Sequence, residues 1–266
     1  MRTGLQISTI KFARWPMPLH YHSMPMVFLW TPKAGCTSLV KWFFFQIGEL
    51  DTALSYNPFV HRYRHEVFVK RDGYFLEGLD LILADEAPVI KLVRDPYARA
   101  VSSFAQLLKL QSVTTGRWTR ELRAGILREL NETAPPGSLS FRQFLRGVAA
   151  IGPASPKLNR HVAQQYQEGE EQLCDRLIRL ENFDAEITGI EREFGLKSSP
   201  LAALTDSRHH RRKVPAPAGS LADRIVSSAD FPEAATPSYD AFYSDETRRL
   251  AAAVYAADFS AYGYPV

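Results

Sequence analysis

The sequence predicts an α/β fold in which a central, mostly parallel sheet is flanked by helices. Two apolar segments, 25–30 (PMVFLW) and 89–93 (VIKLV), have the length of buried strands, and a segment of helical character follows each of them. Strands that alternate with helices are typical of a parallel sheet covered on both faces. The chain has 266 residues, which suits one large domain of this class, so we expect a single domain over 1–266.

The first predicted strand leads through a loop into a helix. The loop is 31–38 (TPKAGCTS), and the helix is expected over 39–47, where most faces are apolar. Gly48 is expected to end this helix.

The second predicted strand is followed by a helix with a clear start. Asp95 is a natural N-cap, and Pro96 suits the first helical position. Four residues then recur at helical spacing, and we expect them to face the core. They are Tyr97, Val101, Phe104 and Leu108.

The remaining elements are read from the same patterns. We expect helices over 116–130, 140–148, 184–194 and 244–255, and a third strand over 176–180. The segment 197–220 is expected to be a loop, and it contains the basic run 208–213 (RHHRRK) with His209 and His210. This run either meets an anionic ligand or is solvated.

Composition excludes several classes of protein. Hydrophobic residues make up 45% and charged residues 23%, as in ordinary globular proteins, and the net charge of +3 does not indicate nucleic-acid binding by itself. No signal-peptide or transmembrane pattern is found. The two cysteines, Cys36 and Cys174, form neither a disulfide framework nor a zinc motif. We therefore expect a cytoplasmic protein with no nucleic-acid partner and no integral membrane segment.

The loop 31–38 has the parts that an anion needs. Backbone N–H groups and a helix N-terminus favour negative charge. Gly35 permits close backbone approach, Lys33 brings a full charge, and Thr37 and Ser38 add hydroxyl donors. The lysine precedes the glycine, so the loop is not a Walker motif. Alternatively, Lys33 is a solvated loop residue and Thr37 a helix cap.

A second candidate site follows the second strand. Arg94 comes directly after it, and ligands of open α/β sheets bind outside the carboxyl ends of the strands. Ser102 shares a helix face with Arg99, so Arg94 and Ser102 could lie near one anion. Alternatively, Arg94 pairs with Asp95 or with a surface carboxylate. Arg99 is expected to be a solvated helix residue.

These two segments carry a resemblance to a known family. The first, 31–39, resembles the 5′-phosphosulfate loop of sulfotransferases that use 3′-phosphoadenosine 5′-phosphosulfate (PAPS), and 94–104 resembles their 3′-phosphate motif. The carbohydrate branch is the most similar, in a soluble, bacterial-type form. Weaker similarities lie at 159–165, at 180–183 (LENF) and at 258–264.

The resemblance implies a P-loop-like three-layer fold and sulfuryl transfer from PAPS to a hydroxyl, expected to belong to a carbohydrate. The product would be 3′-phosphoadenosine 5′-phosphate (PAP), and no metal is needed. Arg94 and Ser102 would hold the 3′-phosphate. The loop would surround the 5′-phosphosulfate with Pro32, Lys33, Ala34, Gly35, Cys36, Thr37 and Ser38. Cys36 is expected to contribute its backbone N–H, because a thiol is a poor donor.

Catalysis requires a cation at the leaving oxygen and a base for the acceptor hydroxyl. Lys33 is the predicted cation. His61 and His65, which lie between the two motifs, are candidate bases because related uronyl sulfotransferases use histidines from a comparable region; on a helix the two would share a face. Glu66 is a rival base, and the weak similarity at 159–165 makes His161 a third histidine candidate, as a base or to position the substrate.

The other polar and aromatic residues are expected to be structural or solvated. His20 and His22 are predicted at the surface, and Trp42 in the core rather than against adenine. A basic group between the motifs is expected to be a solvated face, although it could attract an acidic polysaccharide. It comprises Arg62, Arg64, Lys70 and Arg71. Two other functions remain open, an ATP-dependent kinase and a non-catalytic module that binds nucleotides or polyanions.

Overall fold

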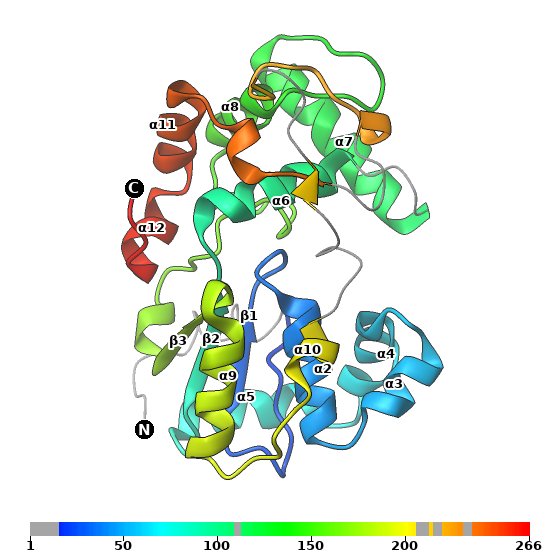
Figure 1. Cartoon of the computed structure of the whole chain (residues 1–266), viewed down its shortest axis with the longest axis vertical. Helices are drawn as coiled ribbons and strands as arrows, with labels where there is room; N and C mark the ends of the chain where they lie inside the picture. The colour runs from blue at the N-terminus through cyan, green and yellow to red at the C-terminus, as the bar shows by residue number, and fades with distance from the viewer. Residues whose placement is uncertain (1–15, 109–112, 206–212, 215–219, 231–235) are drawn as a thin grey trace. The chain divides into compact units, whose positions relative to one another are not determined.

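The computed structural model describes residues 16–108, 113–205, 213–214, 220–230 and 236–266 (Figure 1). Within these residues the chain forms two compact units. The first comprises the described residues within 1–94 and 167–207, and the second comprises those within 95–166 and 208–266. Each unit is described by itself.

The first unit is built on a parallel sheet of three strands in the order β1-β2-β3. The strands are β1 (Val27–Trp30), β2 (Val89–Val93) and β3 (Arg176–Arg179). All three strands predicted from the sequence are therefore confirmed, with small differences at the ends of β1 and β3. Val27 lies opposite Val89, so the carboxyl ends of these strands meet at one edge of the sheet.

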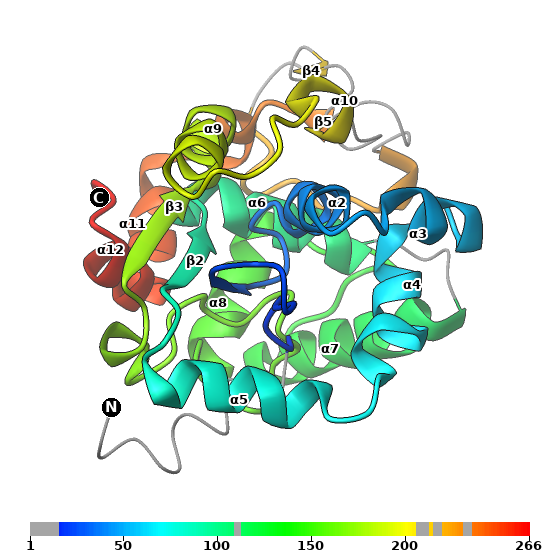
Figure 2. The same ribbon diagram turned by 90° about the horizontal axis from the view of Figure 1, so that it is seen from below.

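Helices cover both faces of this sheet, as the sequence predicts. Figure 2 shows α2 and α9 on one side of the strands and α5 on the other. The helices of the first unit are α2 (Cys36–Gln46), α3 (Leu50–Tyr56), α4 (Val60–Glu66), α5 (Tyr74–Ala84), α9 (Phe183–Glu193) and α10 (Leu201–Thr205). Short 3₁₀ turns add η1 (Phe68–Lys70), η2 (Glu170–Gln172) and η3 (Leu180–Asn182).

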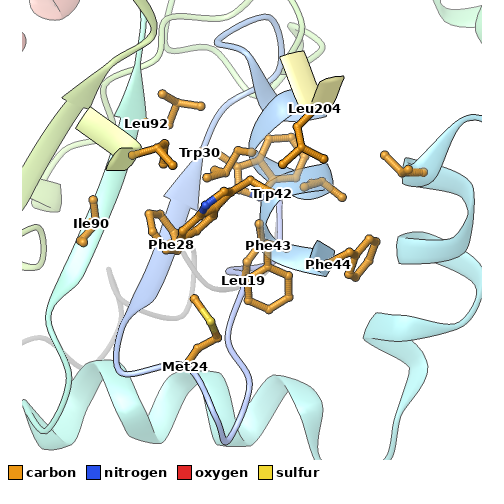
Figure 3. Close-up of a cluster of buried hydrophobic side chains, with 14 of the residues drawn as sticks. Leu19, Met24, Phe28, Trp30, Trp42, Phe43, Phe44, Ile90, Leu92 and Leu204 are labelled. Atoms are coloured by element: carbon orange, nitrogen blue, oxygen red, sulfur yellow. The ribbon is translucent and has the colours of Figure 1, made fainter. Parts of the chain in front are cut away.

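The core between β1 and α2 is rich in aromatic rings. Figure 3 shows Phe28, Trp30 and Trp42 together there, and the rings of Phe28 and Trp42 meet edge to face at 5.2 Å. Trp42 is fully buried, which confirms its predicted place in the core. Its Nε1 donates to Oε1 of the buried Glu191 at 2.7 Å, so the indole N–H is satisfied.

The second unit is helical apart from a parallel pair of two-residue strands, β4 (Lys213–Val214) and β5 (Thr236–Pro237). Its helices are α6 (Pro96–Leu108), α7 (Val113–Leu130), α8 (Phe141–Ile151), α11 (Asp245–Val254) and α12 (Ala256–Tyr262), with 3₁₀ turns η5 (Ser228–Asp230) and η6 (Tyr239–Phe242). All the helices expected from the sequence are present, within a few residues at each end. None of the helices in the described part of the chain has the length and apolar content needed to cross a bilayer.

The start of α6 follows the sequence prediction closely. Asp95 Oδ1 accepts a hydrogen bond of 2.7 Å from the N–H of Ala98, and Pro96 is the first helical residue. Val101, Phe104 and Leu108 are buried as expected, while Tyr97 is half-buried.

The C-terminal segment 258–264, where a weak similarity was noted, has a structural role in the second unit. The buried carboxylate of Asp258 accepts hydrogen bonds from the N–H groups of Gln165 at 2.9 Å and Tyr166 at 2.7 Å. The hydroxyl of Tyr255 donates to the carbonyl of Val162 at 3.1 Å. The end of the chain thus holds the segment that contains His161.

Several expectations about solvation and loops are wrong. The segment 197–220 is not all loop, because α10 forms where Leu204 enters the core, and β4 follows. Arg99 is buried rather than solvated, since its guanidinium donates to the carbonyls of Ala163 at 2.8 Å and Arg160 at 3.1 Å.

His20 is also buried, not at the surface. Its Nε2 donates to the carbonyl of Tyr74 at 2.8 Å, and the two rings stack at 4.1 Å. Gly78 leaves the space, because a Cβ there would come within 2.8 Å of the imidazole. His22, by contrast, is exposed as predicted.

Candidate functional site

The loop after β1 opens directly into α2. The helix begins at Cys36, three residues before the predicted start, so Cys36, Thr37 and Ser38 form its first turn. No side chain caps this end, and the first turn holds no acidic residue. The N–H groups of the first turn have no partner inside the helix, which leaves them suited to an anion.

Two backbone positions in the loop are left-handed. Lys33 has φ 72° and Gly35 has φ 84°. At Gly35 a side chain is also excluded by space, because a Cβ would lie 2.3 Å from Leu180 Cδ1. Leu180 is the first residue of the LENF segment. This segment, which also resembles the family, therefore supports the loop by packing against Gly35.

The left-handed backbone of Lys33 is held from β2. Arg94 Nη1 donates to the carbonyl of Lys33 at 2.9 Å. A left-handed lysine is uncommon and needs support from its surroundings. The arginine of the second motif therefore braces the loop of the first within one unit, a contact that the sequence did not predict. Ser102 lies half-buried on α6 in the second unit.

One of the candidate bases reaches the loop. His61 lies on α4 and is buried, and its Nε2 lies 3.2 Å from Thr37 Oγ1. Its ring is 5.7 Å from that of Trp30 and 5.1 Å from that of Phe59. This contact brings His61 to the first turn of α2.

His65 lies on the same helix but has a different environment. Its Nε2 is 3.2 Å from Arg64 Nη2, and burial together with the charge of Arg64 lowers the pKa of His65 to about 4. The imidazole is neutral near pH 7. The prediction that His61 and His65 belong to one helix is confirmed, but the contact with Thr37 is made by His61.

Glu66 is engaged at the surface. It accepts hydrogen bonds from the Tyr56 hydroxyl at 2.7 Å and from Arg62 Nε at 3.0 Å. These bonds, that of Tyr56 first, hold the pKa of Glu66 below its ordinary value. A carboxylate stabilised in this way is a poorer base than the sequence alone suggested.

His161 belongs to the second unit and is described there alone. Its Nδ1 lies 2.7 Å from Asn159 Oδ1, and its ring stacks on Trp118 at 5.5 Å. These contacts fix the orientation of the imidazole. Its catalytic role stays a prediction.

The thiol of Cys36 is neutral. Burial raises the pKa of Cys36 above its ordinary value, so the thiol keeps its proton at pH 7. This supports a contribution from the backbone N–H. Cys36 and Cys174 are both free cysteines.

Arg64 is buried, contrary to the expectation from the sequence. It was expected on a solvated face, but it is fully buried, and its Cζ lies 4.8 Å from the centre of the Trp30 ring. The sequence carried a signal, because Arg64 follows the buried Val60 by one helical turn and so shares its face. Burial lowers the pKa of Arg64 to about 10, which still leaves it charged at pH 7.

The other members of the basic group behave more as expected. Arg62 and Lys70 are exposed, and Arg71 is partly buried in an ion pair of 2.9 Å with Glu49. Of the basic run, 208–212 lies outside the described residues. In the described ranges of the chain, no group of three or more His, Cys, Asp or Glu is placed to hold a metal ion.

Comparison with known protein families shows which family this chain belongs to. Residues 21–265 match the model of the sulfotransferase family, a match that includes both motifs and both units. The chain belongs to the sulfotransferase family. It is therefore a transferase of sulfuryl groups. No curated protein and no solved structure matches this sulfotransferase.

The lowered pKa of His65 predicts how stability depends on pH. In the unfolded chain the imidazole takes up a proton below about pH 6.5, whereas in the folded protein it resists protonation until about pH 4. The free energy of unfolding should therefore fall as the pH drops between these values, and His65→Gln should flatten the fall in urea titrations. His22→Gln, at an exposed position, is the matched control and should leave the slope unchanged. An equally steep fall in His65→Gln would contradict this assignment.

Proposed function

We propose that this sulfotransferase moves the sulfuryl group of PAPS onto a hydroxyl of a carbohydrate by in-line displacement. The observation that carries the proposal is the hydrogen bond from Arg94, the first residue of the second motif, to the Lys33 carbonyl in the loop of the first motif. We further propose that both units act as one domain with a P-loop-like three-layer fold. The family match supports this, because it runs through both.

The residues of the loop fit a phosphosulfate group. The first turn of α2 is uncapped and has no acidic residue, Lys33 is half-buried, and Gly35 supplies the left-handed backbone that leads into the helix. Such a set offers hydrogen-bond donors and positive charge to an anion. We assign the 5′-phosphosulfate to 32–38 and the 3′-phosphate to Arg94. For Ser102 the same role rests on the resemblance alone.

The donor supplies an activated sulfuryl group, and PAP leaves with the electron pair of the broken S–O bond. Lys33 stabilises the negative charge that develops on the leaving oxygen. Its backbone is held by Arg94, so the side chain starts from a fixed position. The transfer requires no metal in this proposal.

His61 is the base that we propose for the acceptor hydroxyl. It contacts Thr37 in the first turn of α2, whereas His65 has Arg64 against its ring and a pKa of about 4. A base with so low a pKa is weak near neutral pH. His161 remains a candidate for positioning the acceptor.

The acceptor class rests on the resemblance and on one surface feature. Phe59, 57% exposed, lies beside His61 with ring centroids 5.1 Å apart. An exposed aromatic ring next to the base offers a surface on which the apolar face of a sugar can pack. This favours a carbohydrate over a small polar acceptor.

Replacing Lys33 tests the reaction itself. Lys33→Ala should lower the rate of sulfuryl transfer from PAPS by about 100-fold or more, because the developing charge loses its cation. The alanine keeps a Cβ, so the left-handed backbone is no more strained than before. Lys70→Ala, which removes an exposed lysine of the same unit, should be near wild type. Transfer that is unaffected by Lys33→Ala would remove this assignment.

Replacing the two histidines separately tests the choice of base. His61→Ala should lower kcat by about 100-fold or more through the loss of general-base catalysis, while PAP affinity changes little. His65→Ala should lower kcat far less. The measurement is kcat for each variant beside the calorimetric PAP affinity. If His65→Ala is the more damaging change, the base is misassigned.

A further inference from the structure

The charge of Arg64 has no counter-ion in the described part of the chain. The guanidinium is fully buried, and no carboxylate of these residues lies at ion-pair distance from it. Its contacts are the ring of His65 and the face of Trp30. Nε and Nη1 of Arg64 have no hydrogen-bond partner there, nor has Nε1 of Trp30.

Among the described residues, the titratable groups that act on Arg64 are Cys36, Tyr74 and His65, and they are neutral near pH 7. Burial raises the pKa values of Cys36 and Tyr74, and burial with the arginine charge lowers that of His65. The positive charge of Arg64 is therefore uncompensated. Buried arginines are almost always paired, because removing a charge from water without a partner is costly.

The guanidinium of Arg64 lies near the loop between β1 and α2. Arg64 stacks on Trp30, the last residue of β1, and its charge acts on Cys36, the first residue of α2. His61, one helical turn earlier on α4, contacts Thr37 of the same turn of α2. The uncompensated charge thus lies close enough to the N-terminus of α2 to act on its first residue, Cys36.

We propose that Arg64 is the buried counter-charge of the donor site, which favours binding of the phosphosulfate group at the start of α2. This inference rests on the proposed function and deepens it. The phosphosulfate compensates the guanidinium, and the guanidinium in return increases the affinity for the donor. Since Arg64 has no exposed surface, it acts through its electrostatic field, which is strong in a poorly solvated interior.

Calorimetric titration of PAP into variants of the full chain tests this role. Arg64→Met removes the charge and keeps much of the volume, and it should weaken PAP binding by about tenfold or more. Arg64→Lys restores the charge and should recover most of the affinity. Arg62→Met removes the same charge from the exposed side of the same helix and should bind PAP like the wild type. Arg64→Gln is the neutral variant to use if Arg64→Met does not fold.

Unfolding without ligand separates this role from a structural one. Arg64→Met should be at least as stable as the wild type, because an uncompensated buried charge has been removed. A destabilised variant that binds PAP normally would make Arg64 structural only. Equal losses in Arg64→Met and Arg62→Met, or no recovery in Arg64→Lys, would also overturn the inference. If the wild type itself does not bind PAP, the proposed function fails, and the inference fails with it.

Discussion

The candidate site depends on the hydrogen bond from Arg94 to the carbonyl of Lys33. Because β1, β2 and β3 are parallel and adjacent, their carboxyl ends lie at one edge of the sheet. Each end carries one recognisable segment: the loop after β1, Arg94 after β2 and LENF after β3. Arg94 holds the loop by its backbone, and Leu180 fills the space that a side chain at Gly35 would need. The register of the sheet thus brings Arg94 and Leu180 into contact with the loop after β1, and both residues support its backbone.

The loop after β1 and the start of α2 are surrounded by positive charge and N–H donors, which favour an anion. Lys33, Arg94, Arg64 and the uncapped start of α2 all favour negative charge, and the neighbouring thiol and imidazole are neutral. The buried charge of Arg64 costs stability in the absence of an anion, since no carboxylate of the described residues offsets its desolvation. Functional sites commonly carry unfavourable features of this kind. The same features would be offset when an anionic donor is bound.

Local patterns predicted the sheet and most of the helices, because these follow from apolar runs and from caps such as Asp95. They failed where a long-range contact decides the outcome. His20 is buried only because Gly78, far along the chain, leaves space for it. Arg99 is buried because carbonyls more than 60 positions away accept its hydrogen bonds. Arg64 was expected in solvent because it is charged, but its position on α4 places it on the buried face of the helix with Val60. Spacing suggested two anion sites, but no pattern indicated that Arg94 would hold the backbone of Lys33.

The central claim is that the braced loop binds the phosphosulfate end of PAPS. Calorimetric titration of the wild-type protein with PAP, with adenosine 5′-phosphate and with ATP plus Mg²⁺ tests it most directly. PAP should bind most tightly, and adenosine 5′-phosphate more weakly, because it lacks the 3′-phosphate assigned to Arg94. Weak binding of ATP with Mg²⁺ would complete the expected result. Preferential binding of ATP with Mg²⁺, or equal affinity for PAP and adenosine 5′-phosphate, would contradict the account.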